Sequence, residues 1–324
     1  MAPATLDWRR TSGTVLAGLS AVFLGVTPVI GKLALQAGVP PLAVVAFRTA
    51  AASLLLLIVL LPQRKSLSIF PLGLVGCLLA GLINGIGSLF FYAGLSRVDA
   101  SIGQMLFGLY PVWVAVLLFL DGQRPSRLSL AALALSIPAV YLITSGPWQD
   151  VDPLGAGSML IAGILFGLHI PINERVLYEV PAPTVAFYTL LSMTLVVTPA
   201  FFLFSPPAGP LSVEALVPLL GLTAVTFISR VALFSGVKFI GGLQASFLGL
   251  SEILVAVALG ALVLKESLSP AQWMGGVLLG AALLLSGIDP VPRRRTSGRG
   301  WLYWLRPPIP PATARLEDPS IPSD

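Results

Sequence analysis

Charged side chains are scarce in this sequence. Of its 324 residues only 10% are Asp, Glu, Lys or Arg, whereas 56% are hydrophobic, and the mean hydropathy is +0.92. Soluble globular chains carry about 25% charged residues, so the composition excludes a string of ordinary soluble domains. Apolar runs of about 20 residues recur along the chain, which is the length that a helix needs to cross a bilayer. The sequence therefore predicts an all-α membrane protein.

Cysteine and histidine are nearly absent, with one of each, Cys77 and His169. A single cysteine excludes a disulfide framework, and one cysteine with one histidine cannot supply the ligand set of a zinc site. The sequence also lacks a nucleophile elbow, a Walker loop and a dinucleotide fingerprint. We therefore expect no metal, no cofactor and no enzyme activity.

Ten apolar runs predict ten transmembrane helices. They span residues 13–36, 41–61, 71–95, 100–120, 126–146, 153–177, 183–204, 213–236, 242–264 and 270–288. The first run follows a basic N-terminus in the manner of a signal peptide, but no small-residue cleavage site follows it, so we interpret it as a retained helix. Residues 290–324 are rich in proline and arginine, which predicts a disordered cytoplasmic tail.

The basic residues predict how the chain is oriented. The net charge is +5, and Lys and Arg are spread over short loops and the tail, which argues against a nucleic-acid partner. If the chain starts in the cytoplasm, the arginines at 64, 124, 127 and 293–295 all lie on the cytoplasmic side, as the positive-inside rule requires. We expect both termini in the cytoplasm and a location in a bacterial-type inner (plasma) membrane.

The ten spans divide into two units of five, over residues 1–146 and 147–289. Because five is odd, the second unit enters the membrane in the opposite orientation, which predicts two inverted five-helix repeats. A shift of the chain by 142 residues places four glycines or prolines on their own kind: Gly13 on Gly155, Gly25 on Gly167, Pro41 on Pro183 and Gly94 on Gly236. These matches agree with the repeat, although the topology carries the argument.

Five ionisable side chains fall inside the predicted spans: Lys32, Arg48, His169, Arg230 and Glu252. A charge at the centre of a membrane helix costs about 2.5 to 3.5 kcal/mol on insertion scales, so such residues are functional candidates. Lys32 and Arg48 could instead extend to the membrane surface. Arg230 lies about one to two turns inside the end of its predicted helix. It could form an ion pair with Glu252 that only joins helices, or it could face a substrate cavity.

Polar side chains form stripes at helical spacing. Asn84 and Ser88 lie one turn apart on the third span, and Thr226 and Arg230 lie one turn apart on the eighth. The 142-residue shift places Asn84 on Thr226 and Ser88 on Arg230, so both halves present polar groups at one depth, as a binding site at a repeat interface requires. His169 belongs to a third stripe, on the sixth span. Hydrogen bonds between helices with no ligand are the alternative.

Two segments resemble a known family. The run Leu250-Ser-Glu252, its small and apolar continuation to Lys265-Glu266 and the Gly-rich final span are similar to the end of the EamA-type repeat of the drug/metabolite transporter superfamily. Lys32, Pro41 and Phe47-Arg48 resemble the start of the first repeat, so the likeness covers about residues 13–288.

The resemblance implies a fold and the position of a cavity. It implies ten helices in two inverted halves, with a central cavity lined by helices one to four and six to nine. Helices five and ten would lie at the periphery, where a homodimer could form. In the first half Pro111 is kept, and Tyr110 stands where the family usually has an acidic residue, so Tyr110 is a further candidate for the cavity.

We therefore predict a secondary transporter, not an enzyme. It would export or import a small organic metabolite, amino acid-like or drug-like, across the inner membrane by alternating access. Glu252 would bind a proton or a substrate amine, and Arg230 would neutralise it or bind an anion. The other candidates for substrate binding are Arg48, Asn84, Ser88, Tyr110, His169 and Thr226. A channel is one alternative, and a membrane-embedded lipid flippase or lipid-modifying protein is the other.

Overall fold

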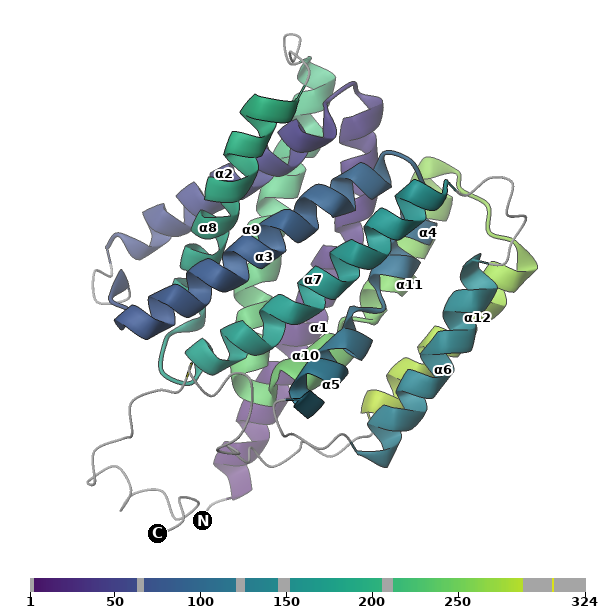
Figure 1. Cartoon of the computed structure of the whole chain (residues 1–324). Coiled ribbons are helices and arrows are strands. Elements are labelled where there is room, and N and C mark those ends of the chain that lie inside the picture. The colour runs from purple at the N-terminus through teal and green to yellow at the C-terminus, as the bar shows by residue number, and fades with distance from the viewer. Residues whose placement is uncertain are drawn as a thin grey trace.

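The structure is a computed structural model, and it describes residues 3–62, 67–120, 126–144, 152–205, 212–287 and 305. Every regular element in these ranges is a helix (Figure 1), as the sequence predicts. The helices are α1 (Pro3–Gln36), α2 (Pro41–Leu60), α3 (Pro71–Leu95), α4 (Ala100–Phe107), α5 (Tyr110–Leu120), α6 (Arg127–Thr144), α7 (Pro153–Leu177), α8 (Ala182–Phe204), α9 (Val213–Ile240), α10 (Gly242–Leu248), α11 (Ser251–Leu259) and α12 (Pro270–Gly287). A π-helical segment, η2 (Gly260–Leu264), continues α11. The predicted tail at 290–324 lies, except for Leu305, outside the described residues.

Prolines and capping side chains set where the helices begin. α2, α3, α7, α8 and α12 each carry a proline in the first turn, where the missing N–H has no helical partner to lose. The Ser212 hydroxyl accepts a hydrogen bond from the Ala215 N–H (3.2 Å) at the start of α9. Ser269 and Gln272 bond to each other's backbone N–H groups and so cap α12. These local signals explain why the observed helices begin close to the residues at which the predicted spans begin.

Eight stretches in the described residues are long and apolar enough to cross a membrane. α4 with most of α5 counts as one of them (Ala100–Leu117), and so do α10, α11 and η2 together (Gly242–Leu264). α6 and α12, at the positions of the fifth and tenth predicted spans, are helices of 18 residues each that fall outside this set. The structure therefore has a helix at every predicted position and identifies eight candidate spans.

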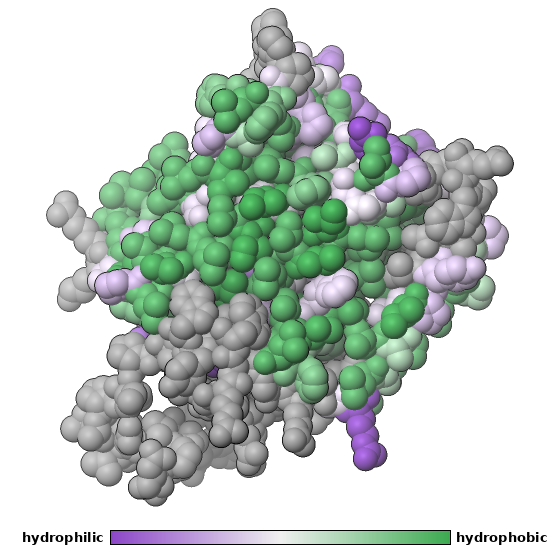
Figure 2. Space-filling view, in the orientation of Figure 1, coloured by the Kyte–Doolittle hydropathy of each residue, from purple (hydrophilic) through white to green (hydrophobic). Residues whose placement is uncertain are grey.

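The surface of the bundle is apolar. Figure 2 shows hydrophobic side chains across the middle of the face in view. Large side chains such as Phe202, Leu216 and Val277 are exposed to the surroundings, which a soluble protein avoids over so wide an area. Lipid is the environment that this surface fits, so the chain is a multi-pass membrane protein.

Two of the predicted spans are each divided into two helices. The fourth span is interrupted at Gly108-Leu109, between α4 and α5, and the ninth at Gly249-Leu250, between α10 and α11. Pro111 lacks the N–H that would continue the helix from α4 into α5. A Cβ at Gly249 would overlap the hydroxyl of Tyr110, so glycine lets the second break lie against the start of α5.

The two halves pack on each other reciprocally. α1 packs against α9 and α3 against α7, while α2 packs with α8 and α6 with α12. The 142-residue shift relates α1 to α7 and α3 to α9, so the first two contacts are the same contact made twice. Figure 1 shows α6 and α12 as a pair at the edge of the bundle, beside the remaining helices.

The glycines that repeat in the sequence repeat in the packing. A Cβ on Gly25 would lie 2.6 Å from the backbone oxygen of Glu252, and a Cβ on Gly167 would lie 2.9 Å from that of Tyr110. Residues 110 and 252 are themselves 142 positions apart. Each glycine lets the first helix of one half approach the broken helix of the other half closely. The repeat is therefore present in the tertiary contacts as well as in the sequence.

Candidate functional site

A small cavity lies where the two halves meet. It is lined by Leu24, Thr27, Arg48, Asn84, Gly87, Ser88, Phe91, Gln104, Phe107, Ala162, Phe166, Arg230 and Glu252. The centre of a water-sized sphere can occupy about 40 Å³ of this cavity. That volume is room for a few water molecules. The lining includes five of the eight candidates from the sequence. The other three, Tyr110, His169 and Thr226, stand one layer behind and hydrogen-bond to residues of the wall.

Glu252 lies in the first turn of α11 and is 1% exposed. Its Oε1 accepts a hydrogen bond from the Tyr110 hydroxyl (3.0 Å), and its Oε2 accepts one from Gln104 Nε2 (3.1 Å). In the described part of the chain the carboxylate forms no ion pair, so the pair with Arg230 that the sequence allowed is not made. Two neutral donors hold Glu252, and one of them, Tyr110, occupies the equivalent position in the first half.

The two polar stripes face each other in two layers. In one layer Arg48 donates from Nη1 to Thr226 Oγ1 (3.2 Å) and from Nη2 to Ser88 Oγ (3.4 Å). In the other layer, one helical turn away, Asn84 accepts from Arg230 Nη1 and Nη2 (3.1 and 3.0 Å) when its amide oxygen faces the guanidinium. The 142-residue shift exchanges the two stripes, because it maps Asn84 onto Thr226 and Ser88 onto Arg230. The structure thus brings together the stripes that the sequence placed at one depth.

Both arginines are buried deep in the bundle, with Arg48 5% and Arg230 3% exposed. Arg48 does not extend to the membrane surface, which removes that interpretation. The guanidinium carbons lie 5.0 Å from the ring centroid of Tyr92 and 5.4 Å from that of Phe166, respectively, distances typical of cation–π contacts. Because α9 continues to Ile240, Arg230 lies about three turns from the end of its helix, deeper than the sequence predicted.

His169 supports Arg230 from behind the cavity wall. Its Nε2 faces Arg230 Nη1 at 3.4 Å, and its Nδ1 contacts the backbone oxygen of Phe166. A guanidinium can only donate and a carbonyl can only accept, so the ring carries its proton on Nδ1. Asn173, in the same stripe, accepts from the Thr189 hydroxyl (3.1 Å) and does not reach the cavity.

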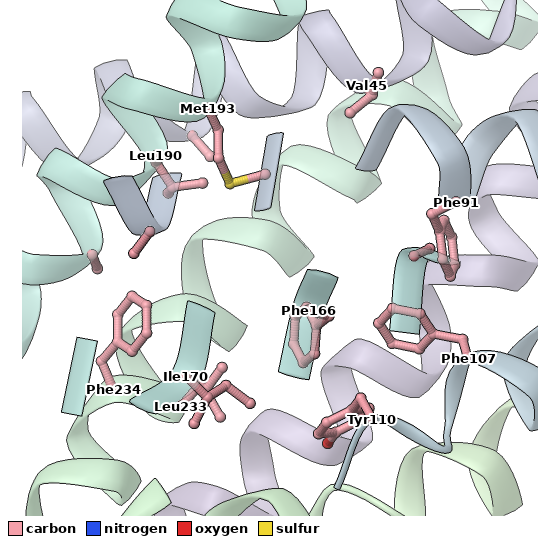
Figure 3. Close-up of a cluster of buried hydrophobic side chains, with 14 of the residues drawn as sticks. Val45, Phe91, Phe107, Tyr110, Phe166, Ile170, Leu190, Met193, Leu233 and Phe234 are labelled. Carbon is pink, nitrogen blue, oxygen red and sulfur yellow. The ribbon is translucent and has the colours of Figure 1, made fainter. Parts of the chain in front are cut away.

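Three phenylalanines that the sequence analysis missed, Phe91, Phe107 and Phe166, line the cavity. Phe107 lies 5.1 Å from Phe91 and 5.0 Å from Phe166 between ring centroids, and Tyr110 lies 4.8 Å from Phe166 (Figure 3). An aromatic residue in an apolar span carries no signal that separates a cavity wall from a core. Gln104 could have been found, because it is a polar side chain in an apolar span, the rule that selected the other candidates.

Two charged residues outside the cavity hold the corner between α3 and α4. Lys32 Nζ donates to the backbone oxygens of Leu95 (2.9 Å) and Val98 (2.7 Å), so it joins α1 to this corner. Glu266 accepts from the backbone N–H groups of Ala100 (2.8 Å) and Ser101 (3.0 Å), the first residues of α4. A carboxylate at a helix N-terminus satisfies donors that the helix itself cannot.

Comparison with known proteins identifies the family. The sequence profile of the EamA-like transporter family matches the chain twice, over residues 11–145 and 153–288. The chain belongs to the EamA-like transporter family. Each match covers one of the two halves that the topology predicts, and the resemblance drawn from the Glu252 and Lys32 segments is confirmed.

Relatives of this EamA-like transporter are themselves described as transporters. An uncharacterized transporter from Synechocystis sp. is 24% identical over 233 residues, which are 67% of each chain. An uncharacterized transporter from Archaeoglobus fulgidus is 26% identical over 199 residues, 60% of this chain and 70% of that one. A protein of known crystal structure superposes with a TM-score of 0.65 at 16% identity, over 88% of this chain and 98% of the other, which shows a shared fold.

The cavity of this transporter is lined by side chains of several chemical kinds. Its wall offers two guanidiniums, one carboxylate, an aromatic face and several hydrogen-bonding side chains. In the residues that the structure describes, no three His, Cys, Asp or Glu side chains are grouped to hold a metal. Such a set can recognise a small molecule by charge, hydrogen bonds and shape.

Proposed function

We propose that this EamA-like transporter is a secondary carrier that exports or imports a small organic metabolite across the inner membrane by alternating access. The supporting observation is the pairing of equivalent positions around one buried cavity: Tyr110 is bonded to Glu252, and the stripe of Asn84 and Ser88 faces the equivalent stripe of Thr226 and Arg230. Ten membrane helices in two inverted halves would make the two sides of the cavity equivalent. Rocking one half against the other would then open the cavity to either side in turn.

Glu252 is the coupling group in this proposal, and it binds a proton in part of the cycle. Neither arginine of the cavity forms an ion pair with the carboxylate in the described residues, and its two hydrogen-bond partners, Tyr110 and Gln104, are neutral. The hydroxyl of Tyr110 can donate to an ionised carboxylate and can accept from a protonated one. Both protonation states can therefore be hydrogen-bonded inside the bundle, which a proton-coupled cycle requires.

The test begins with a thermal-shift screen of the purified full chain against amino acids, organic acids, sugars, nucleosides and cationic drugs. A ligand that binds the native state raises the apparent stability. Compounds that do so are then loaded into vesicles carrying the protein. We expect saturable flux, counterflow of labelled compound, and accumulation driven by a pH gradient.

Variants separate coupling from folding. Glu252→Gln keeps the shape of the side chain and removes its ionisable proton, so it should retain counterflow and lose accumulation driven by the pH gradient. Glu179→Gln changes an exposed carboxylate after α7 and should behave as the wild type.

Two outcomes would identify a different function. Flux without saturation or counterflow would identify a channel, and lipid movement without solute flux would identify a flippase.

A further inference from the structure

The charges around the cavity do not balance. Arg48 and Arg230 both line it, and Glu252 is the acidic residue among the described residues of the lining. The guanidiniums bond to Ser88, Thr226, Asn84 and His169, which are neutral, and form no ion pair in the described ranges. A buried charge with only neutral partners is costly where the dielectric constant is low. The lining carries one excess positive charge with Glu252 ionised and two with it protonated.

Each of the two arginines also has one unpaired donor. The Nε atom of Arg48 and that of Arg230 are buried and have no hydrogen-bond partner in the described residues. A guanidinium presents its N–H groups as a rigid fork that matches the two oxygens of a carboxylate. The two arginine layers are separated by one helical turn, roughly 5.4 Å. One small anion can therefore contact both guanidiniums.

We propose that the cavity binds an organic monocarboxylate, with its carboxylate group held between Arg48 and Arg230. The proposal rests on the carrier function proposed above and names its substrate class. A single negative charge neutralises the lining in the state in which Tyr110 and Gln104 both donate to an ionised Glu252. A phosphate monoester, with two negative charges, would leave that state negative. Phe91, Phe107, Phe166 and Leu24 face the same cavity, so the rest of the ligand is apolar. The cavity in this structure has room for only a few water molecules, so the ligand binds when the two halves move apart in the proposed cycle.

The test compares molecules of one shape and different charge. The probes are 3-phenylpropanoate, its neutral amide, 3-phenylpropylamine and 3-phenylpropyl phosphate, together with the aliphatic series built on 4-methylpentanoate. Binding is measured as the saturable shift of the thermal midpoint of the purified full chain in detergent. We expect a carboxylate of at least one series to bind, and the matching amide, amine and phosphate to bind at least about tenfold more weakly, since a charge-assisted hydrogen bond is worth about a tenfold change or more.

Variants assign the binding to the two arginines. Arg48→Gln and Arg230→Gln should each weaken carboxylate binding by about tenfold or more. Arg97→Gln, which removes an exposed arginine outside the cavity, should not. Glu252→Gln removes the negative charge of the lining and should bind the carboxylate more tightly than the wild type. This last variant gains affinity, so it tests the proposal even if the arginine variants fail to fold.

Several results would overturn the proposal. The first is binding of the amide, amine or phosphate that equals or exceeds that of the carboxylate. The second is unchanged binding in folded Arg48→Gln and Arg230→Gln proteins, and the third is unchanged or weaker binding in Glu252→Gln. The fourth is the lack of a shift with any probe. Counterflow in vesicles separates this failure from failure of the carrier function. If only amines or neutral compounds show counterflow, the protein is a carrier but the anion site is wrong. If a carboxylate binds and no compound shows counterflow, the anion site stands but the carrier function is wrong.

Discussion

At the scale of single residues, the contact between Tyr110 and Glu252 depends on the missing side chain at Gly249. A Cβ there would overlap the buried Tyr110 hydroxyl. We expect Gly249→Ala to displace the tyrosine, lower the free energy of unfolding by about 1 to 3 kcal/mol and abolish accumulation driven by a pH gradient. Thermal unfolding and vesicle uptake measure the two effects.

Two companion variants test the cause of this effect. Gly280→Ala places the same methyl group where no atom lies within 4 Å, so it should leave stability and uptake unchanged. Tyr110→Phe in the Gly249→Ala protein removes the overlapping oxygen and should restore part of the stability. A Gly249→Ala protein that is as stable as the wild type would contradict the position of the tyrosine.

The partners of Arg230 can be ranked by double-mutant cycles. Arg230 bonds to Asn84 and makes no ion pair with Glu252 in the described residues. We expect the cycle of Arg230→Gln with Asn84→Ala to give a coupling near the 0.6 kcal/mol average of membrane bundles, reaching about 1.7 kcal/mol at most. The cycle of Arg230→Gln with Glu252→Gln should give less, and a larger value would mean that the two charges pair directly.

At the scale of elements, α7 begins with a charge-dependent cap. Asp152 Oδ1 accepts from the Leu154 N–H, and Oδ2 accepts from Arg97 Nη1, both at 2.8 Å. The hydrogen bond from Arg97 and those from the α7 backbone lower the pKa of Asp152 below the ordinary value of an aspartate. A lowered pKa contributes stability that is present above the ordinary pKa and is lost as the pH falls through the lowered one.

This cap gives a pH prediction. Asp152→Asn should keep the cap, since asparagine also accepts from a helix N-terminus, but it should lose the acid-dependent contribution. We expect the thermal midpoints of the variant and the wild type to differ at neutral pH and to converge as the pH falls below about 4. A constant difference across that range would mean that the charge of Asp152 contributes nothing.

The broken helices show where local reasoning stopped short. Pro111 was visible as a helix breaker, and the structure does interrupt the helix just before it, at Gly108-Leu109. The matching break at Gly249 has no proline. At this break Gly249 lies against the Tyr110 hydroxyl of another helix, a contact that hydropathy and helical spacing do not report.

At the scale of the whole molecule, the orientation in the membrane is a prediction that the single cysteine makes easy to test. Cys77 is buried, so an impermeant maleimide should label only cysteines that are introduced at the surface. We expect Arg97→Cys to be labelled from outside the cell and Glu179→Cys only after the cytoplasmic side is opened. Labelling of both from the same side would contradict ten spans with cytoplasmic termini.

A homodimer through α6 and α12, the pair of helices at the edge of the bundle in Figure 1, also stays a prediction.

The sequence by itself determined the membrane environment, the positions of the helices and the 142-residue repeat, because hydropathy, proline placement and topology are local or additive properties. It also placed Asn84, Ser88, Thr226 and Arg230 at one depth. Only the tertiary structure decided that Glu252 bonds to Tyr110 and Gln104 rather than to Arg230.

Only the tertiary structure decided that Arg48 lines the cavity and does not reach the membrane surface. A partner on another helix depends on how far each helix is rotated and how closely the backbones approach. Those quantities are set by contacts such as that of Gly25 with the backbone of Glu252, between residues far apart in the chain, so no pattern within a single span could have revealed them.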